Sequence, residues 1–580
     1  MSSESPKIYE FGPFRLDTSE RVLTRDEHIV GLSPKVMDLL SFLVERHGRV
    51  INKAEILKEL WPDKAIDEAN LSQTLYLLRQ TLGKDHNKRY YVETIPRRGY
   101  RFVANVKQID NTQPDSESSA ITLAVLPLLN ASGDTSAEFF SDGLTETIIN
   151  LLSQMQNLRV LSRSSVFRYK GQSVDPKNLG RELGVRFLFS GKVISITNRL
   201  VIQVELVDTN KGWQLWGEQY NRQSSDVFEV QESIAKEIVE GLHIKLGEKE
   251  KKLLTRRPTE NTEAYYMLLR GFHLIRKMTV ESMLKSVDCF QQAIILDPKY
   301  ALAYAGLSQV YATLAWIAIG VCSSKDVMPR AKEAAFKALE IDPSLAEGYT
   351  ALGLIKTTFE WDWDGAEQAF KKAIECNPHY ADAYLFYGYL LAYQRKSAHA
   401  IKMMKHALTL EPLDLMFNTA LAWIFYYSSE FDSAIEQCEK TLELDPHHSM
   451  ALLALALSYQ GKQRYSEALE EIDRAITYSR GSAYLIAVKG RILAYAGKTN
   501  EARDILAELQ HLSQQRYISP FIFAMIHEAL DEKDQTFAYL EKAFEECSSG
   551  ISFLNALPLR DSIQKDQRFI NFLQCAGFVA

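Results

Sequence analysis

The pattern of apolar and polar positions in the first hundred residues predicts a small domain that mixes strands and helices. Short extended runs between residues 11 and 30 are separated by polar turns, which indicates small antiparallel strands. Three segments with helical periodicity follow. The first begins at Ser33-Pro34, the second follows Asn52, and the third spans residues 68–82.

The third predicted helix has two faces of different character. Leucines at helical spacing indicate a buried stripe: Leu71, Leu75, Leu78 and Leu82. The opposite face is polar, small or aromatic and nearly free of acid: Ala69, Gln73, Tyr76 and Gln80, flanked by Asn70 and Ser72. After Gly83 the run YVETIPRRGYRF predicts a hairpin whose bend holds Arg97 and Arg98.

Strand and helix patterns alternate in the middle of the chain. The apolar run ITLAVLPLL predicts a buried strand, and an amphipathic helix of about residues 137–155 follows it. Further along we expect a strand near residues 158–162, a short helix near 177–183, strands within 185–219 and a helix at 226–246. This alternation predicts an α/β domain over residues 121–250.

The second half of the chain has a single period. Pro378, Pro412 and Pro446 lie 34 residues apart, and Pro343 lies 35 residues before the first of them. A 34-residue period with small residues at fixed offsets is typical of tetratricopeptide repeats, in which helix pairs stack on their neighbours. The pattern predicts roughly seven or eight such pairs.

These patterns together predict a multidomain fold, in which a winged helix (α+β) is followed by an α/β domain and an all-α tetratricopeptide-repeat solenoid. The expected segments are a winged-helix domain over 1–107, a polar linker over 108–120, the α/β domain over 121–250, the repeats over 251–547 and a capping segment over 548–580. An array of this kind presents a concave surface, so we expect a protein or peptide partner there.

Composition narrows the class of protein. The chain of 580 residues has six widely spaced cysteines and no cluster of Cys or His at metal-ligand spacing. No apolar run approaches the ~20 residues of a membrane-spanning helix. We therefore expect a cytoplasmic protein with no membrane partner and no metal.

Charge is unevenly distributed. The formal net charge is -7, yet residues 79–107 hold eight Lys and Arg residues against Asp85 and Glu93, a net charge of +6. A polyanion is attracted to such a segment. Taken singly, the polar face of the third helix and the hairpin are each explained as an ordinary solvated surface. Together, and beside this basic segment, they favour binding of double-stranded DNA.

Residues 8–107 resemble the winged-helix DNA-binding domain of OmpR/PhoB-type regulators, through the strands, the run LYLLRQTLG and the run TIPRRGYRF. The resemblance implies that residues 68–82 form the recognition helix and that Trp61, Asp63 and Lys64 lie in a loop facing RNA polymerase. The DNA-contacting residues expected from residues and resemblance together are Asn70, Ser72, Gln73, Tyr76, Arg79, Gln80, Thr94, Arg97, Arg98 and Tyr100. Tyr76 and Leu77 stand where the family usually has basic residues, which leaves the preferred DNA sequence open.

The middle domain resembles the TolB amino-terminal-like domain, through AVLPLLNASGDTSAEFFSDGLTETI and the stretch that ends in WQLWGEQY. We find no phosphate-binding loop, zinc motif or nucleophile elbow in it, so we predict that the protein is not an enzyme and has no cofactor or catalytic residue. The run Ser162-Arg163-Ser164-Ser165 suits a small anion or, as we favour, local backbone capping. Trp213 and Trp216 suit a stacked ligand or, as we favour, the core.

The order of the three domains resembles that of HilA-type transcriptional activators over nearly the whole chain. The resemblance implies a bacterial, sequence-specific DNA-binding transcriptional regulator, an activator, whose repeats bind a protein or effector that controls it. The residues themselves leave activation versus repression open. The alternative is a repeat scaffold whose winged helix binds protein rather than DNA, which Tyr76 and Leu77 would suit.

Overall fold

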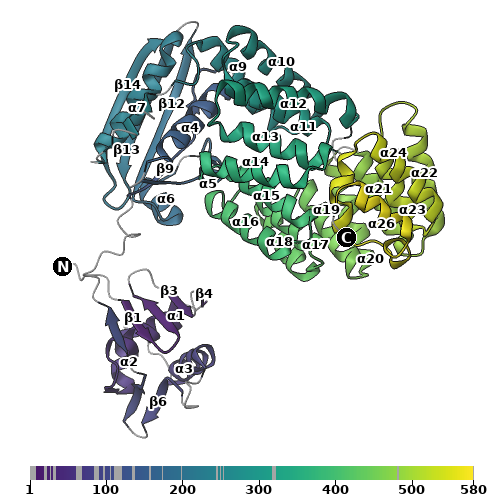
Figure 1. Cartoon of the computed structure of the whole chain (residues 1–580). Coiled ribbons are helices and arrows are strands. Elements are labelled where there is room, and N and C mark those ends of the chain that lie inside the picture. Colours follow the sequence, from purple (N-terminus) through teal and green to yellow (C-terminus); the bar gives the residue numbers. More distant parts are fainter. Residues whose placement is uncertain are drawn as a thin grey trace. The chain divides into compact units, whose positions relative to one another are not determined.

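The computed structural model describes residues 8–18, 22–25, 28–30, 34–60, 68–83, 90–95, 98–104, 106–109, 121–133, 138–155, 158–172, 174–196, 199–242, 244, 246–247, 250–251, 254–255, 257–316, 320, 322–479 and 482–578. The chain forms two compact units, Met1–Ser119 and Ala120–Ala580 (Figure 1). Each unit has its own hydrophobic core.

The first unit contains two antiparallel sheets. One has the strand order β4-β3-β2-β1-β8. Its strands are β1 (Ile8–Phe11), β2 (Phe14–Asp17), β3 (Val22–Arg25), β4 (His28–Ile29) and β8 (Lys107–Ile109). The other has the order β5-β7-β6, formed by β5 (Val50–Ile51), β6 (Val92–Ile95) and β7 (Gly99–Phe102).

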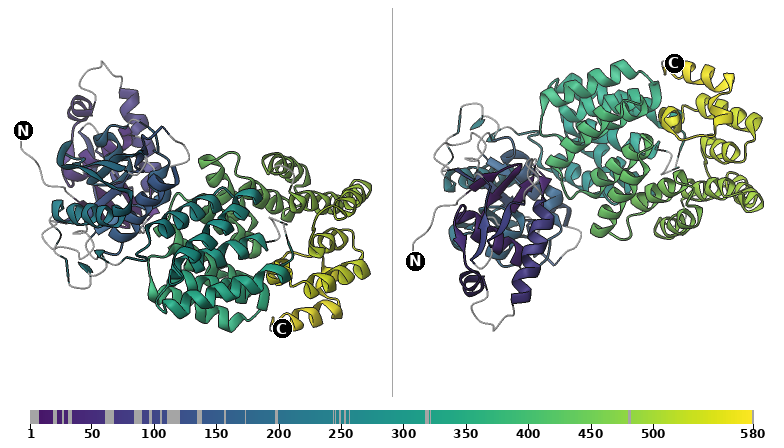
Figure 2. Two further views of the ribbon diagram at one scale, coloured as in Figure 1. Left: turned by 90° about the horizontal axis from the view of Figure 1, so that it is seen from above. Right: turned by 90° about the horizontal axis from the view of Figure 1, so that it is seen from below.

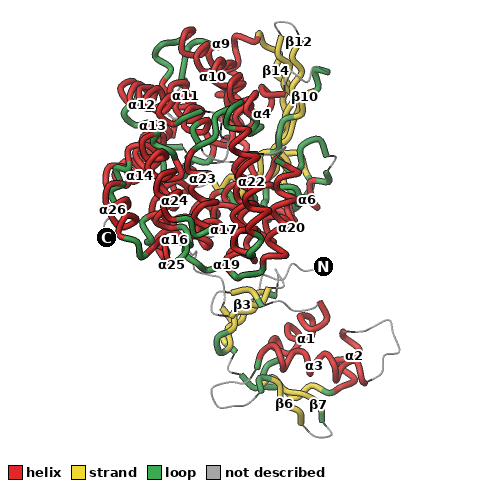
Figure 3. Tube along the Cα trace, turned by 90° about the vertical axis from the view of Figure 1, so that its right-hand side faces the viewer, coloured by secondary structure: helices red, strands yellow, loops and turns green. Residues whose placement is uncertain are grey.

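Three helices pack with these sheets: α1 (Pro34–Glu45), α2 (Lys53–Leu60) and α3 (Glu68–Leu82) (Figure 3). Asn52 caps α2, because its side-chain oxygen accepts from the backbone N–H of Glu55 at 2.8 Å. The core joins the leucine stripe of α3 to an aromatic cluster of Phe11, Phe14, Tyr91 and Phe102. Helices and hairpin occur in the predicted order, which confirms the winged-helix fold.

Gly99 fixes the path of the hairpin. Its φ is +135°, and a Cβ there would lie 1.9 Å from the backbone oxygen of Ile51. No residue with a side chain fits, because β7 pairs with β5 at this point. The glycine of the PRRG run is therefore required by backbone packing.

The second unit begins with a mixed sheet of order β11-β9-β12-β13-β14, with β10 paired to β12. The strands are β9 (Ile121–Val125), β10 (Leu129–Asn130), β11 (Leu158–Val160), β12 (Phe187–Ile196), β13 (Arg199–Asp208) and β14 (Trp213–Gln223). β9 is parallel to β11 and β12, and the last three strands are antiparallel. The α/β prediction is confirmed.

Helices cover this sheet and connect it to the repeats. They are α4 (Glu138–Leu152), α5 (Arg163–Phe167), α6 (Pro176–Leu183) and α7 (Val227–Gly241), with the short η2 (Ser224–Asp226) before α7. α4 packs against the sheet, against α7 and against α9 (Thr262–Ile275), the first helix of the array. The α/β part and the repeats thus belong to one compact unit, in which no separate body ends near residue 250.

Trp213 and Trp216 differ in their surroundings. Trp216 stacks on Phe189 with ring centroids 6.5 Å apart, as expected of a core residue. Trp213 is 66% exposed at the start of β14, so the prediction that it lies in the core is wrong. β14 is the edge strand of the sheet, and most of its side chains are exposed.

Among the described residues eight helix pairs form the array (Figure 2). They are α9 with α10 (Val280–Leu296), α11 (Ala301–Leu314) with α12 (Ser324–Ile341), α13 (Ala346–Ile355) with α14 (Trp363–Cys376), α15 (Ala381–Tyr393) with α16 (Ser397–Leu410), α17 (Leu415–Tyr427) with α18 (Phe431–Leu444), α19 (Ser449–Gly461) with α20 (Tyr465–Tyr478), α21 (Ala483–Tyr495) with α22 (Thr499–Leu512), and α23 (Pro520–Ala529) with α24 (Lys533–Glu545). A one-turn π-helix, η3 (Lys356–Glu360), extends α13. The repeat prediction is confirmed.

The backbone shows the 34-residue period more completely than the prolines do. Within successive pairs the turn holds a residue in the left-handed conformation, and these lie 34 residues apart: Trp361, Arg395, Ser429, Gln463, Gly497 and Asp531. Glycine occupies only one of the six positions. The turn geometry therefore comes from helix packing, which holds side-chain-bearing residues in a conformation they disfavour.

The C-terminal residues return across the array. η4 (Ser549–Ala556) packs against α15 and η3, and α25 (Asp561–Gln564) and α26 (Gln567–Cys575) follow it. Asn555 donates to the backbone oxygen of Tyr393 at 3.1 Å, and the Trp363 ring nitrogen donates to that of Ala576 at 3.0 Å. The segment predicted as a cap thus also contacts the third and fourth helix pairs.

Candidate functional site

Helix α3 buries the leucine stripe that the sequence predicted and exposes Tyr76. Its four leucines are buried, whereas Tyr76 on the opposite side is 66% exposed. The side chains of Asn70, Ser72, Gln73 and Gln80 lie outside the described part of the helix. A helix that is anchored along one side and exposes Tyr76 on the other is compatible with entry into a major groove.

Arg79 lies between the recognition helix and the hairpin. Its Nε donates to the backbone oxygen of Val92 at 2.9 Å, and a terminal nitrogen donates to Oγ1 of Thr94 at 2.8 Å. Both acceptors belong to β6. Arg79 therefore fixes the hairpin against α3, and Thr94 is its partner in that contact.

The hairpin tip brings positive charge to the surface. Arg98 is exposed, while Arg97 lies outside the described residues. Arg101 is tied to Glu93 by an ion pair of 2.8 Å, which lowers the charge available near the base of the hairpin. Tyr100 is only 7% exposed and belongs to the core, which leaves little of its ring to contact DNA.

The predicted polymerase-facing loop, with Trp61, Asp63 and Lys64, falls outside the described residues. Its assignment stays a prediction.

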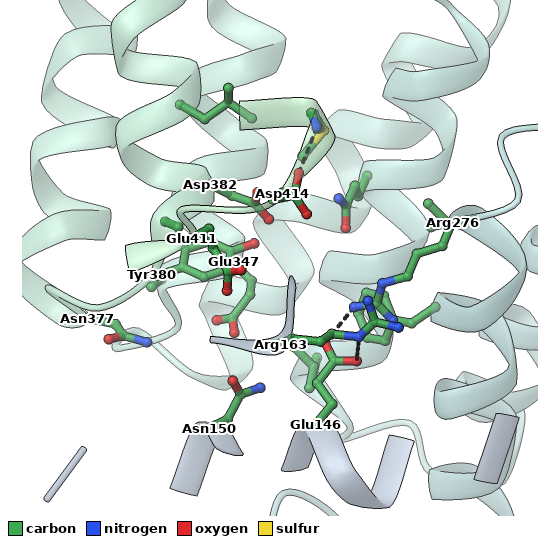
Figure 4. Close-up of a pocket in the computed structure, with 18 of the residues that line it drawn as sticks. Glu146, Asn150, Arg163, Arg276, Glu347, Asn377, Tyr380, Asp382, Glu411 and Asp414 are labelled. Atoms are coloured by element: carbon green, nitrogen blue, oxygen red, sulfur yellow. Dashed lines mark hydrogen bonds and ion pairs between the residues drawn. The ribbon is translucent and has the colours of Figure 1, made fainter. Parts of the chain in front are cut away.

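A cavity of about 2340 Å³ lies within the second unit. One wall comes from the α/β part and α9, and the other from the first helices of the repeat pairs and the turns that precede them (Figure 4). η4 borders it through Ser549 and Phe553. We call this cavity the chamber.

Carboxylates gather on the repeat wall of the chamber. They come from the starts of three successive first helices and from the end of α16: Glu347, Asp382, Asp414 and Glu411 (Figure 4). Asp414 also caps α17, because its Oδ1 accepts from the backbone N–H of Met416 at 2.7 Å. Three turns thus direct acidic side chains into one space.

Burial and mutual repulsion act on these groups. Burial, the neighbouring Asp414 charge and, more weakly, Glu347 raise the pKa of Asp382 to about 6. Burial also raises the pKa of Glu411 to about 6. Both carboxylates are ionised at pH 7 at a cost in stability.

The opposite wall has two arginines that share one carboxylate. Arg276 contacts Oε1 of Glu146 at 2.5 Å, and Arg163 lies 3.5 Å from Oε2 of the same side chain. Burial lowers the pKa of Arg163, and the charge of Arg276 adds to the effect. The group of Arg163, Arg276 and Glu146 therefore carries one net positive charge.

The serine run of the middle domain joins the two walls. Ser164 donates from its hydroxyl to Oε2 of Glu411 at 2.5 Å and from its backbone N–H at 3.3 Å. Ser162, the N-cap of α5, makes no side-chain cap hydrogen bond. Local capping is therefore the wrong prediction for Ser162, and the hydroxyl of Ser164 serves a contact between distant parts of the chain.

Aromatic side chains also line the chamber: Tyr389, Tyr393, Trp423, Tyr427, Tyr484 and Phe553. Tyr393 packs edge to face on Tyr427 with ring centroids 5.6 Å apart. Thr419 and Tyr300 also line the chamber, and their buried hydroxyls have no hydrogen-bond partner among the described residues. The chamber thus combines carboxylates, aromatic rings and unsatisfied polar groups.

Sequence reasoning did not find the chamber. The prolines marked the turns before α15 and α17, and an acidic residue in the first helical turn was the available signal. Such residues are also explained by the helix dipole, so only the fold shows that they face one space.

Two further properties concern the described residues alone. No helix among them has both the length and the apolar character to cross a membrane. No group of three or more His, Cys, Asp or Glu residues in this part of the chain is placed to hold a metal ion.

Family models match three parts of the chain. The transcriptional regulatory protein C-terminal model matches residues 26–102, the HilA/YgeH-like transcriptional regulator second-domain model matches 118–237, and a tetratricopeptide-repeat model matches 419–483. The first is a DNA-binding winged helix of the OmpR type, and the matches agree with the two units and the array of the fold.

Curated relatives cover different shares of the chain. Transcriptional regulator HilA of Salmonella typhi is 27% identical over 436 residues, 74% of this chain and 75% of HilA. "Putative adenylate cyclase 3" of Rhizobium meliloti is 34% identical over 233 residues, only 40% of each chain. Transcriptional activator CadC of Escherichia coli is 25% identical over 100 residues, 17% of this chain and 20% of CadC.

Proposed function

We propose that this chain, which has the domain composition of the HilA-type transcriptional regulators, binds double-stranded DNA sequence-specifically and activates transcription under the control of a partner held by its repeats. One observation carries the proposal. α3 is anchored by its leucines, is exposed at Tyr76, and is fixed by Arg79 to a hairpin whose tip exposes Arg98.

The two parts of this surface have different tasks. We propose that Asn70, Ser72, Gln73, Tyr76 and Gln80 contact base edges, because amides, hydroxyls and aromatic rings distinguish bases in a major groove. Arg97 and Arg98 contact phosphates or the minor groove, where guanidinium groups bind without regard to most of the sequence. Arg79 and Thr94 act as positioning residues.

The location follows from the partner. A regulator of this type works where the DNA is, so we propose a bacterial cytoplasmic protein. We also propose that the loop with Trp61, Asp63 and Lys64 contacts RNA polymerase, as the resemblance to OmpR/PhoB-type regulators implies.

The test measures DNA retained by the full chain across a genome, for wild type and for Arg97→Ala with Arg98→Ala. We expect the double variant to bind at least several-fold more weakly at every site, because it loses phosphate contacts. Arg199→Ala with Arg222→Ala, which removes two exposed arginines from the second unit, is the matched control. Equal retention by all three proteins would remove the proposal and leave the protein-binding scaffold.

Gln73→Ala and Tyr76→Ala test the helix face separately. We expect each to change the preferred DNA sequence more than the general affinity. An unchanged preference would show that another face of the helix contacts the bases.

Catalysis is not part of the proposal. The relatives that match as regulators support a role without an enzymatic step, and the similarity to the cyclase-named relative covers 40% of each chain. Turnover of a nucleotide by the full chain would contradict this part.

A further inference from the structure

We propose that the chamber binds a basic peptide segment of a partner protein, whose lysine or arginine side chains lie on the carboxylates of the repeat wall and whose apolar side chain packs on the aromatic rings of the lining. The inference rests on the proposed role of the repeats in binding a partner, and it assigns the place and the chemistry of that partner.

The size of the chamber favours a peptide. Pockets for small molecules usually have volumes of about 300–1,000 Å³. The chamber, at about 2340 Å³, is more than twice as large as the upper value. An extended segment with several side chains fills such a space, whereas a single small metabolite would leave most of it to water.

The charge of the lining favours a cation. Among the described residues that line the chamber there are ten Asp and Glu side chains and five Lys and Arg side chains. Asp382, Glu411 and Asp414 form no ion pair with a described Lys, Arg or His residue. The charge of Arg276 acts on Asp382, but that guanidinium is already bound to Glu146.

The chamber also has unsatisfied hydrogen-bonding groups. Thr419 is 4% exposed and Tyr300 is fully buried, and neither hydroxyl has a partner. A buried hydroxyl without a partner costs free energy, so such groups are usually bound to something. A peptide backbone supplies donors and acceptors at regular spacing along its whole length.

The carboxylates are retained although they weaken the fold. Burial raises the pKa of both Asp382 and Glu411 to about 6, so each carries its charge at neutral pH at a cost in folding free energy. Strain of this kind concentrates at binding sites, where a ligand of opposite charge relieves it. Aromatic rings beside the acids add a surface for an apolar or cationic side chain.

Binding is measured with the full chain and two labelled probe peptides by fluorescence anisotropy. One peptide alternates lysine with serine around a central tryptophan, and the other has glutamate in place of every lysine. We expect the lysine peptide to bind at least tenfold more tightly. Equal affinity of the two peptides would overturn the proposal.

Asp382→Asn with Asp414→Asn locates the site. Asparagine keeps the N-cap of α17, so the fold is preserved, and a thermal melt checks this. We expect the lysine peptide to bind about tenfold more weakly, while Glu439→Gln with Glu470→Gln, two exposed acids outside the chamber, leaves the affinity unchanged. Equal affinities of the two double variants would refute the site.

A second variant, Glu411→Gln, keeps the acceptor for Ser164 and removes only the charge. We expect this variant to bind the lysine peptide several-fold more weakly than the wild type does. An affinity equal to that of the wild type would count against the proposal. The same preparations are tested for DNA binding. If the wild-type chain does not bind DNA, the proposed function is rejected. If it binds DNA but the peptide tests fail, only the inference about the chamber is rejected.

Discussion

The proposed DNA-binding surface of the first unit, formed by α3 and the β6–β7 hairpin, and the chamber of the second unit use charge in opposite ways. The first concentrates Lys and Arg at a hairpin whose Arg98 is exposed, and its cations need only be near the surface to attract a polyanion. The chamber gathers Asp and Glu on one wall, where burial makes the charges of Asp382 and Glu411 costly. Exposed charges are suited to attracting a partner over a distance. Buried charges are suited to discriminating between ligands that are in direct contact with them.

The two surfaces should differ most in how strongly their binding depends on salt concentration. Raising the salt concentration from about 50 to 200 mM is expected to weaken DNA binding by about a thousandfold if some six or more phosphates are contacted. The affinity for the lysine peptide should fall only a few-fold, because the peptide is held by a few partly buried ion pairs that salt screens poorly. Affinities of the full chain for both ligands across a salt series provide the measurement. A flat response of DNA binding would favour the scaffold function.

Removal of one charge of a buried ion pair in the second unit tests whether the two units unfold independently. Arg491 and Glu528 are both buried and lie 3.7 Å apart, and Arg491 also donates to the backbone oxygen of Pro558 at 2.8 Å. Glu528→Gln is expected to lower the free energy of unfolding of this unit by about 3 kcal/mol, because an unpaired buried guanidinium remains. Calorimetry should show the transition of the first unit unchanged.

The control for that variant is Asp561→Asn, which breaks an exposed ion pair with Lys565. Exposed pairs contribute little, so we expect no measurable shift. A joint shift of both transitions with Glu528→Gln would show that the units unfold together.

The cost of acid in the chamber is tested by pH. The pKa of Asp382 in the fold, about 6, lies above its ordinary value of 3.8, so the folded state binds the proton more tightly than the unfolded state. Stability from this group is present at low pH and is lost as the pH rises through about 6. The groups that act on it are Asp414, Glu347, Arg276 and Tyr380.

Asp382→Asn should therefore raise the free energy of unfolding above pH 6 by on the order of 1 kcal/mol, and the gain should vanish near pH 4. Denaturation by urea at several pH values measures this. Asp561, whose pKa is lowered by Lys565, is the contrast, and its replacement by Asn should give no gain at any pH. A gain for Asp382→Asn that does not change with pH would contradict the assigned cause.

The smallest effect concerns the turns of the array. Gly497 has a φ of +78° with open space around its missing Cβ, so Gly497→Ala should cost about 1 kcal/mol through the backbone alone. Gln463 occupies the equivalent position one repeat earlier with a φ of +61°. Gln463→Gly should raise the free energy of unfolding by a similar or smaller amount. Thermal unfolding of the two variants measures both changes. Equal signs for the two variants would contradict the equivalence of these turns.

Much of the architecture follows from local patterns. The leucines of α3, the cap at Asn52 and the prolines between repeats each define an element through interactions with near neighbours in sequence. The 34-residue period was visible in three prolines, and it continues in the turns through Asp531 because each helix pair repeats the same local geometry. Trp213 was misplaced, since the position of a strand at the edge of its sheet is not a local property.

The sequence by itself determined the fold class, the order of the parts and the basic hairpin, because periodicity, caps and charge are properties of short segments. Only the tertiary structure decided that Arg79 fixes the hairpin, that Ser164 meets Glu411, and that acids from three repeats face one chamber. Those contacts join residues as many as 247 positions apart. Their proximity depends on how whole helices stack, which no short pattern along the chain records.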